Sequence, residues 1–371
     1  MIPPNYQGTV QGRVEREVPV LTSITQAEFY QDYFLKNTPC LIRGGAKDWP
    51  AVKKWHSDDY LKKLAGNRKI FKTTSIRDDF GFNHQSPMEY MKFGEFLAHY
   101  QDNSQYYIND SDIPSILVQD MGNHEILEGF NRLEHYHKRT GFFLGAGEQY
   151  APLHYDDEEN IYVLIDGEKE FPLFDIADFR KMYAYDHPDS PDFSPVDVNN
   201  VDDQTFPLFK EVTRYNAHLY PGDMLYVPGY WWHSVRSQGR NMALSYVRTD
   251  RISQLMAYIK LVKNDALPIS ESDKQTMLTM LYYRDETAIN TQQELQNEGC
   301  LRECNIFYLY LKLGLLYEFL KNKQEGIIAV KNAFERVQPM VKNELHKGNY
   351  SYPVVYLMQN FYRMNVGIFE V

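Results

Sequence analysis

The chain has 371 residues, of which 43% are hydrophobic, 15% aromatic and 24% charged, so we expect a folded protein with a sizeable core and not a disordered one. Its formal net charge of −11 argues against broad nucleic-acid binding, because phosphate contacts require clustered lysine and arginine. The three cysteines, Cys40, Cys300 and Cys304, are too few and too unevenly spaced for a disulfide framework.

The N-terminal stretch MIPPNYQGTVQGRVERE lacks the apolar segment of a secretory signal. The most apolar run, IFYLYLKLGLLYEFL at 306–320, is interrupted by Lys312 and Glu318 and is too short to span a bilayer. These features predict an intracellular protein, cytoplasmic or nuclear, with no membrane partner.

The region from residue 24 to residue 100 mixes helical and strand patterns. TQAEFYQDYFLKN (25–37) has helical spacing with Thr25 as its N-cap, whereas TPCLIRGGAKDWP (38–50) predicts a short strand that ends in a glycine turn. PMEYMKFGEFLAHYQ (87–101) is again typical of a helix, and SQYYIND (104–110) is typical of a strand that meets a turn.

Between about 140 and 250, short apolar runs such as NIYVLI, MLYV and MALSYVR alternate with turn residues, which predicts a β-sandwich or barrel. The segment 181–209 is rich in Pro, Asp and Asn and predicts a long insertion over the mouth of a sheet. From 251 onward apolar residues recur at helical spacing. We therefore expect a mainly β domain at 1–250, with its core at about 140–250, and a helical region at 251–371.

One histidine stands before four consecutive acidic residues in the sequence LHYDDEENIYVLI. His154 and Asp156 form an H-x-D triplet, and His233 follows within PGYWWHSV. Residues two apart in a strand point the same way, so His154 and Asp156 can converge, and His233 could approach from across the sandwich. Two histidines and a carboxylate are the ligand set of the facial triad that binds iron(II). The acidic residues that follow, 157–159, offer an alternative carboxylate, although strand parity favours Asp156.

A lysine follows the next predicted turn. The Asp166-Gly167 pair predicts a two-residue β-hairpin that pairs Tyr162 with Phe171 and puts Lys169 on the same sheet face. If that face is buried, the lysine needs an anionic partner. If the face is exposed, the lysine is simply solvated, and parity alone leaves both alternatives open.

Residues 151–174 and 219–247, which contain these motifs, resemble the Jumonji-C, cupin-like oxygenases that depend on iron(II) and 2-oxoglutarate. The likeness is greatest to the asparaginyl hydroxylase that inhibits the hypoxia-inducible factor and to the Jumonji-C lysyl hydroxylase of small GTP-binding proteins. It covers residues 20–250 approximately, including the PCLIRGGAKDWPAVKKW segment. The resemblance implies a double-stranded β-helix (jelly-roll) core, preceded by α/β elements.

The same resemblance implies the roles of single residues. His154, Asp156 and His233 would be the iron(II) ligands, and Lys169 would bind the distal carboxylate of 2-oxoglutarate, with O2 as the second co-substrate.

Further co-substrate contacts are implied for Tyr107, with Tyr106 as the alternative if the alignment is shifted by one residue. Tyr162 and Asn160 fall at positions that line the co-substrate pocket in relatives. Ala151 departs from the family, in which a threonine often occupies this position and contacts the co-substrate.

The implied activity is hydroxylation of a side chain in a protein or peptide substrate, with release of succinate and CO2. Two alternatives remain, a small-molecule oxygenase of a biosynthetic pathway and a metal-binding cupin module without catalysis. By analogy with the asparaginyl hydroxylase, the C-terminal helices predict a homodimer.

Overall fold

The computed structural model describes residues 14–34, 36–72, 89–102, 106–127, 138–156, 158–185 and 192–248. The chain divides into two units, and every strand among the described residues belongs to the unit formed by Met1–Asp175, Lys181–Tyr183 and Phe193–Ser253. The second unit, Ile176–Arg180, Ala184–Asp192 and Gln254–Val371, is described only at 176–180, 184–185 and 192. The predicted C-terminal helices and the homodimer therefore lie outside the described residues and remain predictions.

Two large sheets form the body of the first unit. The five-stranded sheet has the order β1 (Val14–Glu17), β11 (Thr213–Leu219), β10 (Lys169–Phe174), β13 (Trp232–Ser237) and β8 (Gln149–His154). The seven-stranded sheet has the order β2 (Val20–Leu21), β3 (Cys40–Ile42), β12 (Met224–Val227), β9 (Glu159–Asp166), β14 (Asn241–Arg248), β7 (Lys138–Gly145) and β6 (Ile108–Asp112). A small antiparallel sheet pairs β4 (Lys69–Lys72) with β5 (Glu89–Lys92).

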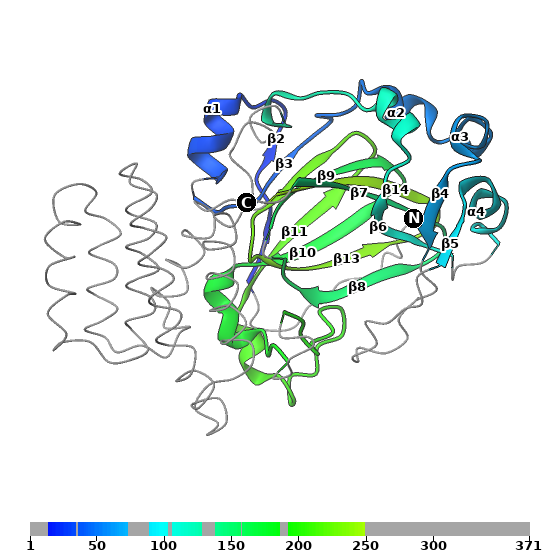
Figure 1. Ribbon diagram of the computed structural model, residues 1–371. Helices are drawn as coiled ribbons and strands as arrows, with labels where there is room; N and C mark the ends of the chain where they lie inside the picture. The colour runs from blue at the N-terminus through cyan, green and yellow to red at the C-terminus, as the bar shows by residue number, and fades with distance from the viewer. Residues whose placement is uncertain are drawn as a thin grey trace, which may run out of the picture. The chain divides into compact units, whose positions relative to one another are not determined.

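From β8 to β14 the chain passes repeatedly from one large sheet to the other. Strands β8, β10, β11 and β13 lie in the five-stranded sheet, whereas β9, β12 and β14 lie in the seven-stranded sheet. This alternation is the winding of a jelly roll, in which two sheets face each other across one core. The predicted mainly β, jelly-roll architecture is confirmed (Figure 1).

Helices precede the jelly roll. They are α1 (Gln26–Phe29), which continues into a π-helical turn at Tyr30–Phe34, α2 (Pro50–Lys54), α3 (Asp58–Ala65) and α4 (Phe93–His99), together with a 3₁₀ turn at Ser115–Asp120. Thr25 caps α1 as predicted: the Glu28 backbone N–H donates to Thr25 Oγ1 at 3.3 Å, and Glu28 Oε2 accepts from the Thr25 backbone N–H at 2.9 Å. The helix predicted at 87–101 is half wrong, because its first part is strand β5 and only α4 is helical.

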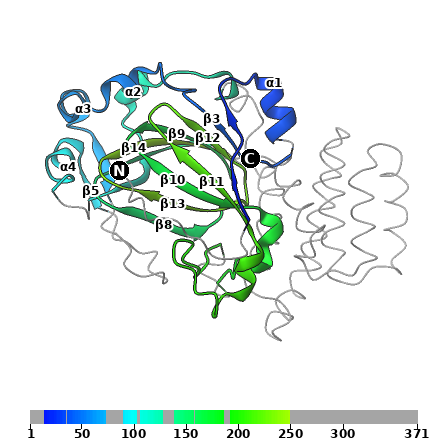
Figure 2. The ribbon, with the colours of Figure 1, turned by 180° about the vertical axis from the view of Figure 1, so that it is seen from behind.

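Strand β9, in the middle of the seven-stranded sheet, is buried on both faces. Ile161 and Val163 of β9 pack with Trp55 in the cluster beneath the helices, and Leu164 of the same strand packs with Leu173 of β10 inside the sandwich. Figures 1 and 2 show that α2, α3 and α4 lie on the outer side of the seven-stranded sheet. Strands β13 and β8 of the five-stranded sheet lie on the opposite side of the sandwich. A strand covered on both sides must be apolar throughout, which explains the uninterrupted run IYVLI.

The hairpin predicted at Asp166-Gly167 is wrong. Gly167 does turn the chain with a positive φ of 82°, but β9 and β10 enter different sheets and do not pair. Tyr162 and Phe171 nevertheless meet, because they face each other across the interior with ring centroids 5.0 Å apart. The predicted contact between Tyr162 and Phe171 is therefore correct, but the predicted pairing of their strands is wrong.

The insertion after β10 is mostly irregular within its described part. It begins with a 3₁₀ turn at Ile176–Lys181 and ends with another at Pro207–Glu211. Between them the chain returns to the end of β8, where Ser194 N donates to Leu153 O at 2.9 Å and Phe193 forms an isolated β-bridge with His154. The insertion thus reaches the mouth of the five-stranded sheet, as predicted.

Candidate metal centre and buried lysine

Three predicted ligands converge at one end of the five-stranded sheet. His154 ends β8, His233 is the second residue of β13, and the two are Cα partners in neighbouring strands. Asp156 lies just beyond β8, and its Oδ2 is 3.7 Å from His233 Nε2. One ligand atom from each of the three residues lies within 4.8 Å of the others. The sequence predicts that His233 approaches from across the sandwich, and this is wrong. His233 reaches the cluster from β13, the strand adjacent to β8.

Backbone carbonyl groups orient both imidazoles. His154 Nδ1 is 2.7 Å from Pro152 O, and His233 Nδ1 is 3.0 Å from Trp231 O. A carbonyl oxygen can only accept a hydrogen bond, so each Nδ1 carries the proton and each Nε2 presents a lone pair. This is the tautomer that a metal ligand requires, and such hydrogen bonds hold ligating histidines in place.

The cluster is enclosed on one side and open on the other. The His233 side chain is 6% exposed and that of Asp156 is 43% exposed. The Phe193 ring stacks on His154 at 5.1 Å between centroids, with an interplanar angle of 14°. Two imidazoles and one carboxylate leave room for other ligands of a metal ion, which suits a site where substrates bind beside iron(II).

Lys169 is buried inside the sandwich. The residue is 1% exposed, and its Nζ lies 5.9 Å from the centre of the Tyr162 ring. Burial lowers the pKa of Lys169 to about 7. Among the described residues its Nζ has a hydrogen bond to Ser237 Oγ, at 3.3 Å, and no carboxylate partner. The solvated alternative for this lysine is therefore wrong, because the face that carries it is buried.

Ser237 connects the lysine to an amide network that sequence reasoning missed. Ser237 Oγ donates to Gln149 Oε1 at 3.4 Å, and Asn241 Nδ2 donates to the same oxygen at 2.6 Å. Gln149 Nε2 donates in turn to Ala146 O at 2.6 Å. Strand parity could have revealed Ser237, because it lies four residues after His233 on the same face of β13.

Tyr107, which is half-buried, and Tyr162, which is buried, are neighbours. Burial raises the pKa of both phenols, and the proximity of Tyr107 raises the pKa of Tyr162 further. The alternative, Tyr106, belongs elsewhere: it stacks with Phe96 at 6.3 Å between centroids, and Lys72 Nζ lies 4.4 Å from its ring centre. Of the two tyrosines, only Tyr107 is a neighbour of Tyr162 in the described contacts.

Asn160 shares the inward face of β9 with Tyr162, and its Oδ1 accepts a hydrogen bond from Ser245 Oγ at 2.9 Å. Ala151 lies in β8, where its carbonyl oxygen accepts from Ser234 Oγ at 2.7 Å. Its methyl group supplies no hydrogen bond of the kind that a threonine would give.

The acidic residues after His154 have different environments. Asp157 lies outside the described residues. Glu159, one of the residues that offered an alternative carboxylate, is the fully buried first residue of β9. Its carboxylate accepts hydrogen bonds from the Tyr226 hydroxyl and from the Gly229 backbone N–H, the latter at 3.0 Å.

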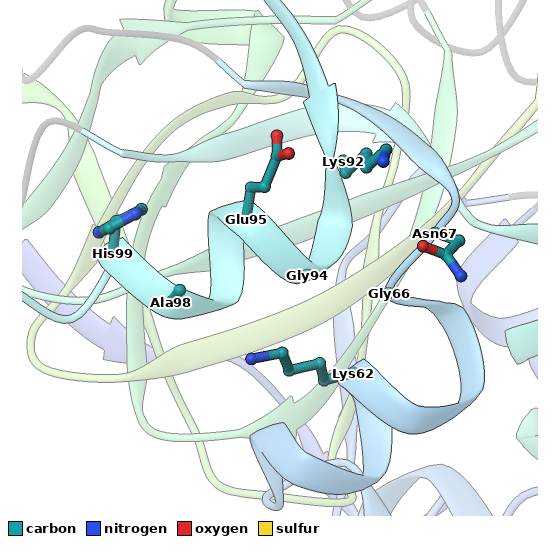
Figure 3. Close-up of a pocket in the computed structure, with 8 residues that line it drawn as sticks. All are labelled: Lys62, Gly66, Asn67, Lys92, Gly94, Glu95, Ala98 and His99. Carbon is teal, nitrogen blue, oxygen red and sulfur yellow. The ribbon is translucent and has the colours of Figure 1, made fainter.

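A surface pocket of about 440 Å³ lies between α3 and α4 (Figure 3). The residues that line it are Lys62, Gly66, Asn67, Lys92, Gly94, Glu95, Ala98 and His99. None of the predicted site residues is among them, so this pocket is separate from the metal cluster. Within the described part of the chain, no helix combines the length and apolar character needed to cross a membrane.

Comparisons with known proteins identify relatives of this chain. The chain is 29% identical over 234 residues to Lysine-specific demethylase JMJ30 of Arabidopsis thaliana, which covers 59% of this chain and 51% of that protein. It is 25% identical over 257 residues to human Bifunctional peptidase and (3S)-lysyl hydroxylase JMJD7, covering 58% and 78%. It is also 25% identical over 241 residues to human tRNA wybutosine-synthesizing protein 5, covering 60% and 74%.

The chain thus spans little more than half of the length of the first of these relatives. The family model described as a cupin-like domain matches residues 26–247, more than half of the chain, and this range includes both large sheets apart from β1, β2 and the last residue of β14. The relatives and this match confirm the predicted resemblance to Jumonji-C, cupin-like proteins. The chain belongs to the cupin-like domain family.

Proposed function

We propose that this protein is an iron(II)- and 2-oxoglutarate-dependent oxygenase that hydroxylates a side chain of a protein or peptide. The observation that carries the proposal is the convergence of His154, Asp156 and His233 in a sandwich whose interior also holds Lys169 without a carboxylate partner in the described residues. When bound, iron(II) with 2-oxoglutarate and O2 supplies the oxidative decarboxylation that yields succinate, CO2 and a hydroxylated product.

In this proposal the three clustered residues hold the metal. The Nε2 atoms of His154 and His233 and the carboxylate of Asp156 are its ligands, and the Nδ1–H bonds to Pro152 O and Trp231 O keep the two imidazoles in the required tautomer. The exposed side of Asp156 leaves the cluster open to a substrate.

Lys169 would bind the distal carboxylate of the co-substrate. A buried ammonium group whose described contact is one serine hydroxyl is costly, and a carboxylate beside it removes most of that cost. On β13 four residues, about 13 Å of strand, separate His233 from Ser237, the partner of Lys169. This distance is long enough for 2-oxoglutarate, a five-carbon diacid, to lie between a metal at His233 and the ammonium group of Lys169. Tyr107, Tyr162 and Asn160 would line the pocket.

The class of substrate is inferred from the insertion after β10 and not from the family. The relatives include a demethylase, a lysyl hydroxylase and a protein of tRNA wybutosine synthesis, so the family alone does not select one reaction. We favour a polypeptide substrate because the insertion that reaches His154 at Phe193 can form one wall of an extended groove. A small-molecule oxygenase and a non-catalytic cupin are the alternatives.

The test is anaerobic addition of iron(II) and 2-oxoglutarate to the full chain, followed by absorption spectroscopy. We expect the weak visible charge-transfer band of the chelate, and we expect it to disappear in His154→Ala. His218→Ala is the matched control, because His218 lies on the outer face of β11, 3.2 Å from Glu168, and should leave the band unchanged.

Absence of a band in the unmodified protein, or a band that survives His154→Ala, would contradict the proposed site. A band without succinate formation in air would favour the non-catalytic cupin. If succinate forms, a mass gain of one oxygen on a peptide separates the polypeptide hydroxylase from the small-molecule oxygenase.

A further inference from the structure

The loop between β12 and β13 is held at both backbone polar groups of one residue, Gly229. Gly229 N–H donates to Glu159 Oε1 at 3.0 Å, and Gly229 O accepts from Asn37 Nδ2 at 3.1 Å. Both side chains belong to fully buried residues, and they come from positions 70 and 192 residues away in the chain. Such a two-sided grip fixes the loop much more firmly than either bond alone.

Each of the two gripping residues has a second attachment. The other carboxylate oxygen of Glu159 accepts from the Tyr226 hydroxyl, at the end of β12. Asn37 accepts from Trp231 Nε1 through its backbone oxygen, at 2.9 Å, and through its side-chain oxygen, at 3.0 Å. The loop is therefore fastened at its start, its middle and its end.

This loop contacts two of the proposed metal ligands through its backbone. Tyr230 N–H donates to Asp156 O at 2.7 Å, and Trp231 O accepts from His233 Nδ1 at 3.0 Å. Tyr230 also has a positive φ of 65°, which is unfavourable for a residue with a bulky side chain. Such a conformation persists only where its surroundings enforce it, and Glu159 and Asn37 act on the residue immediately before Tyr230.

Glu159 is not needed merely to fill space. A buried carboxylate is costly, and an apolar side chain of similar size would pack in its place without that cost. It lies on the outward face of β9, away from Tyr162, and Arg248 is its Cα partner on β14. Glu159 therefore stabilises the loop through its hydrogen bonds and not through the volume of its side chain.

We infer that Glu159 and Asn37 are positioning residues of the metal centre: by gripping Gly229 they set the loop that orients Asp156 and His233. This inference rests on the proposed metal site. Neither residue touches the ligand atoms in the described contacts, so both act through the backbone of 229–231.

The test uses the full chain and cobalt(II) alone as the probe, with affinity measured by calorimetric titration well below the melting temperature of each variant. Glu159→Gln and Glu159→Met form a matched pair of similar shape, of which only the glutamine can accept from Gly229 N–H. Asn37→Gly removes the amide on the other side of the loop and tolerates the positive φ of 46° at that position.

We expect cobalt(II) affinity to fall about 10-fold or more in Glu159→Met, as for residues that orient metal ligands, and to stay within about threefold in Glu159→Gln. Asn37→Gly should also lower the affinity for cobalt(II). If Glu159→Met does not fold, the result for Asn37→Gly tests the inference. A folded Glu159→Met with unchanged affinity, or an unchanged Asn37→Gly in its place, would overturn the inference. Failure of the unmodified chain to bind cobalt(II) would instead contradict the proposed function.

Discussion

The two large sheets of the jelly roll differ in what covers them. The seven-stranded sheet has an apolar cluster on each face, with helices over its outer side. The five-stranded sheet has one apolar face, and its outer face carries polar groups such as Glu170 and His218, whose side chains are partly exposed. His154, His233 and Lys169, three of the four residues of the proposed chemistry, lie in the five-stranded sheet.

This difference suggests that the two sheets contribute differently to stability and to ligand binding. Apart from the buried Glu159 and Arg248, which are Cα partners in β9 and β14, the seven-stranded sheet supplies mainly apolar buried area. The five-stranded sheet carries Lys169, which is buried without a carboxylate partner among the described residues. Strained or costly groups are common at functional sites, where the rest of the fold compensates for them. Mutations in the two sheets should therefore affect stability and ligand binding differently.

The largest effect on stability is expected in the seven-stranded sheet. Phe142 of β7 is fully buried, and its ring makes edge-to-face contacts with Trp55 and Phe93, at 6.2 Å and 6.1 Å between centroids. Phe142→Ala removes this contact and leaves a cavity, so we expect the free energy of unfolding to fall by about 3–5 kcal/mol. Urea denaturation measures this change.

Glu170→Ala on the outer face of the five-stranded sheet is the control, and it should change the free energy of unfolding by no more than about 0.5 kcal/mol. Cobalt(II) affinity of folded Phe142→Ala should equal that of the unmodified chain. A loss of metal affinity in this variant would contradict the separation between the sheets.

The second prediction concerns Lys169→Met, for which stability and binding should change in opposite directions. Without co-substrate at pH 6, removal of a buried ammonium that lacks a carboxylate partner should raise the free energy of unfolding by about 1–4 kcal/mol. The affinity for 2-oxoglutarate should fall about 30-fold or more, because a buried charge partner is worth about 2–5 kcal/mol. Thermal denaturation and calorimetric titration in the presence of cobalt(II) measure the two quantities.

Lys210→Met provides the comparison, since the Lys210 side chain is 44% exposed and lies 3.8 Å from Asp203. It should leave both quantities nearly unchanged. If Lys169→Met destabilises the protein and binds 2-oxoglutarate normally, then Lys169 is a structural residue and not the carboxylate site.

The sequence was informative where chemistry is carried by residue type and spacing. The H-x-D triplet and the later histidine identified the cluster that the structure brings within 4.8 Å. The Asp166-Gly167 turn was misread because its local signal is the same whether the two strands pair or enter opposite sheets. A turn sequence specifies a change of direction, and the packing of distant strands decides the rest.

The supporting network could not be read in the same way. The partners of Ser237 are Lys169 and Gln149, 68 and 88 residues away, and those of Glu159 are 67 and 70 residues away. Strand parity places Ser237 on the same face of β13 as His233 but does not identify its distant partners, and a glutamate within an acidic run is normally solvated. Glu159 becomes recognisable only when its burial and its two donors are seen together.

The last prediction is a pH dependence that originates at Lys169 of the five-stranded sheet. The pKa of Lys169 is lowered to about 7 by burial, compared with about 10.4 for an unfolded chain. Between these two values Lys169 binds its proton more fully in the unfolded chain than in the folded chain, so its contribution to the stability of the ligand-free protein should rise as the pH increases from about 7 to about 10. Below pH 7 both states carry the charge, and this contribution is constant.

Binding of 2-oxoglutarate should show the opposite trend. The carboxylate requires the protonated lysine, so affinity should be constant below pH 7 and weaken by up to tenfold per pH unit above it, because binding must then take up a proton. Titrations with cobalt(II) at fixed saturation from pH 6 to pH 9 measure this slope, and Lys169→Met should remove it. A flat profile in the unmodified chain would mean that Lys169 stays protonated without ligand, which would require a negative partner beyond the described residues.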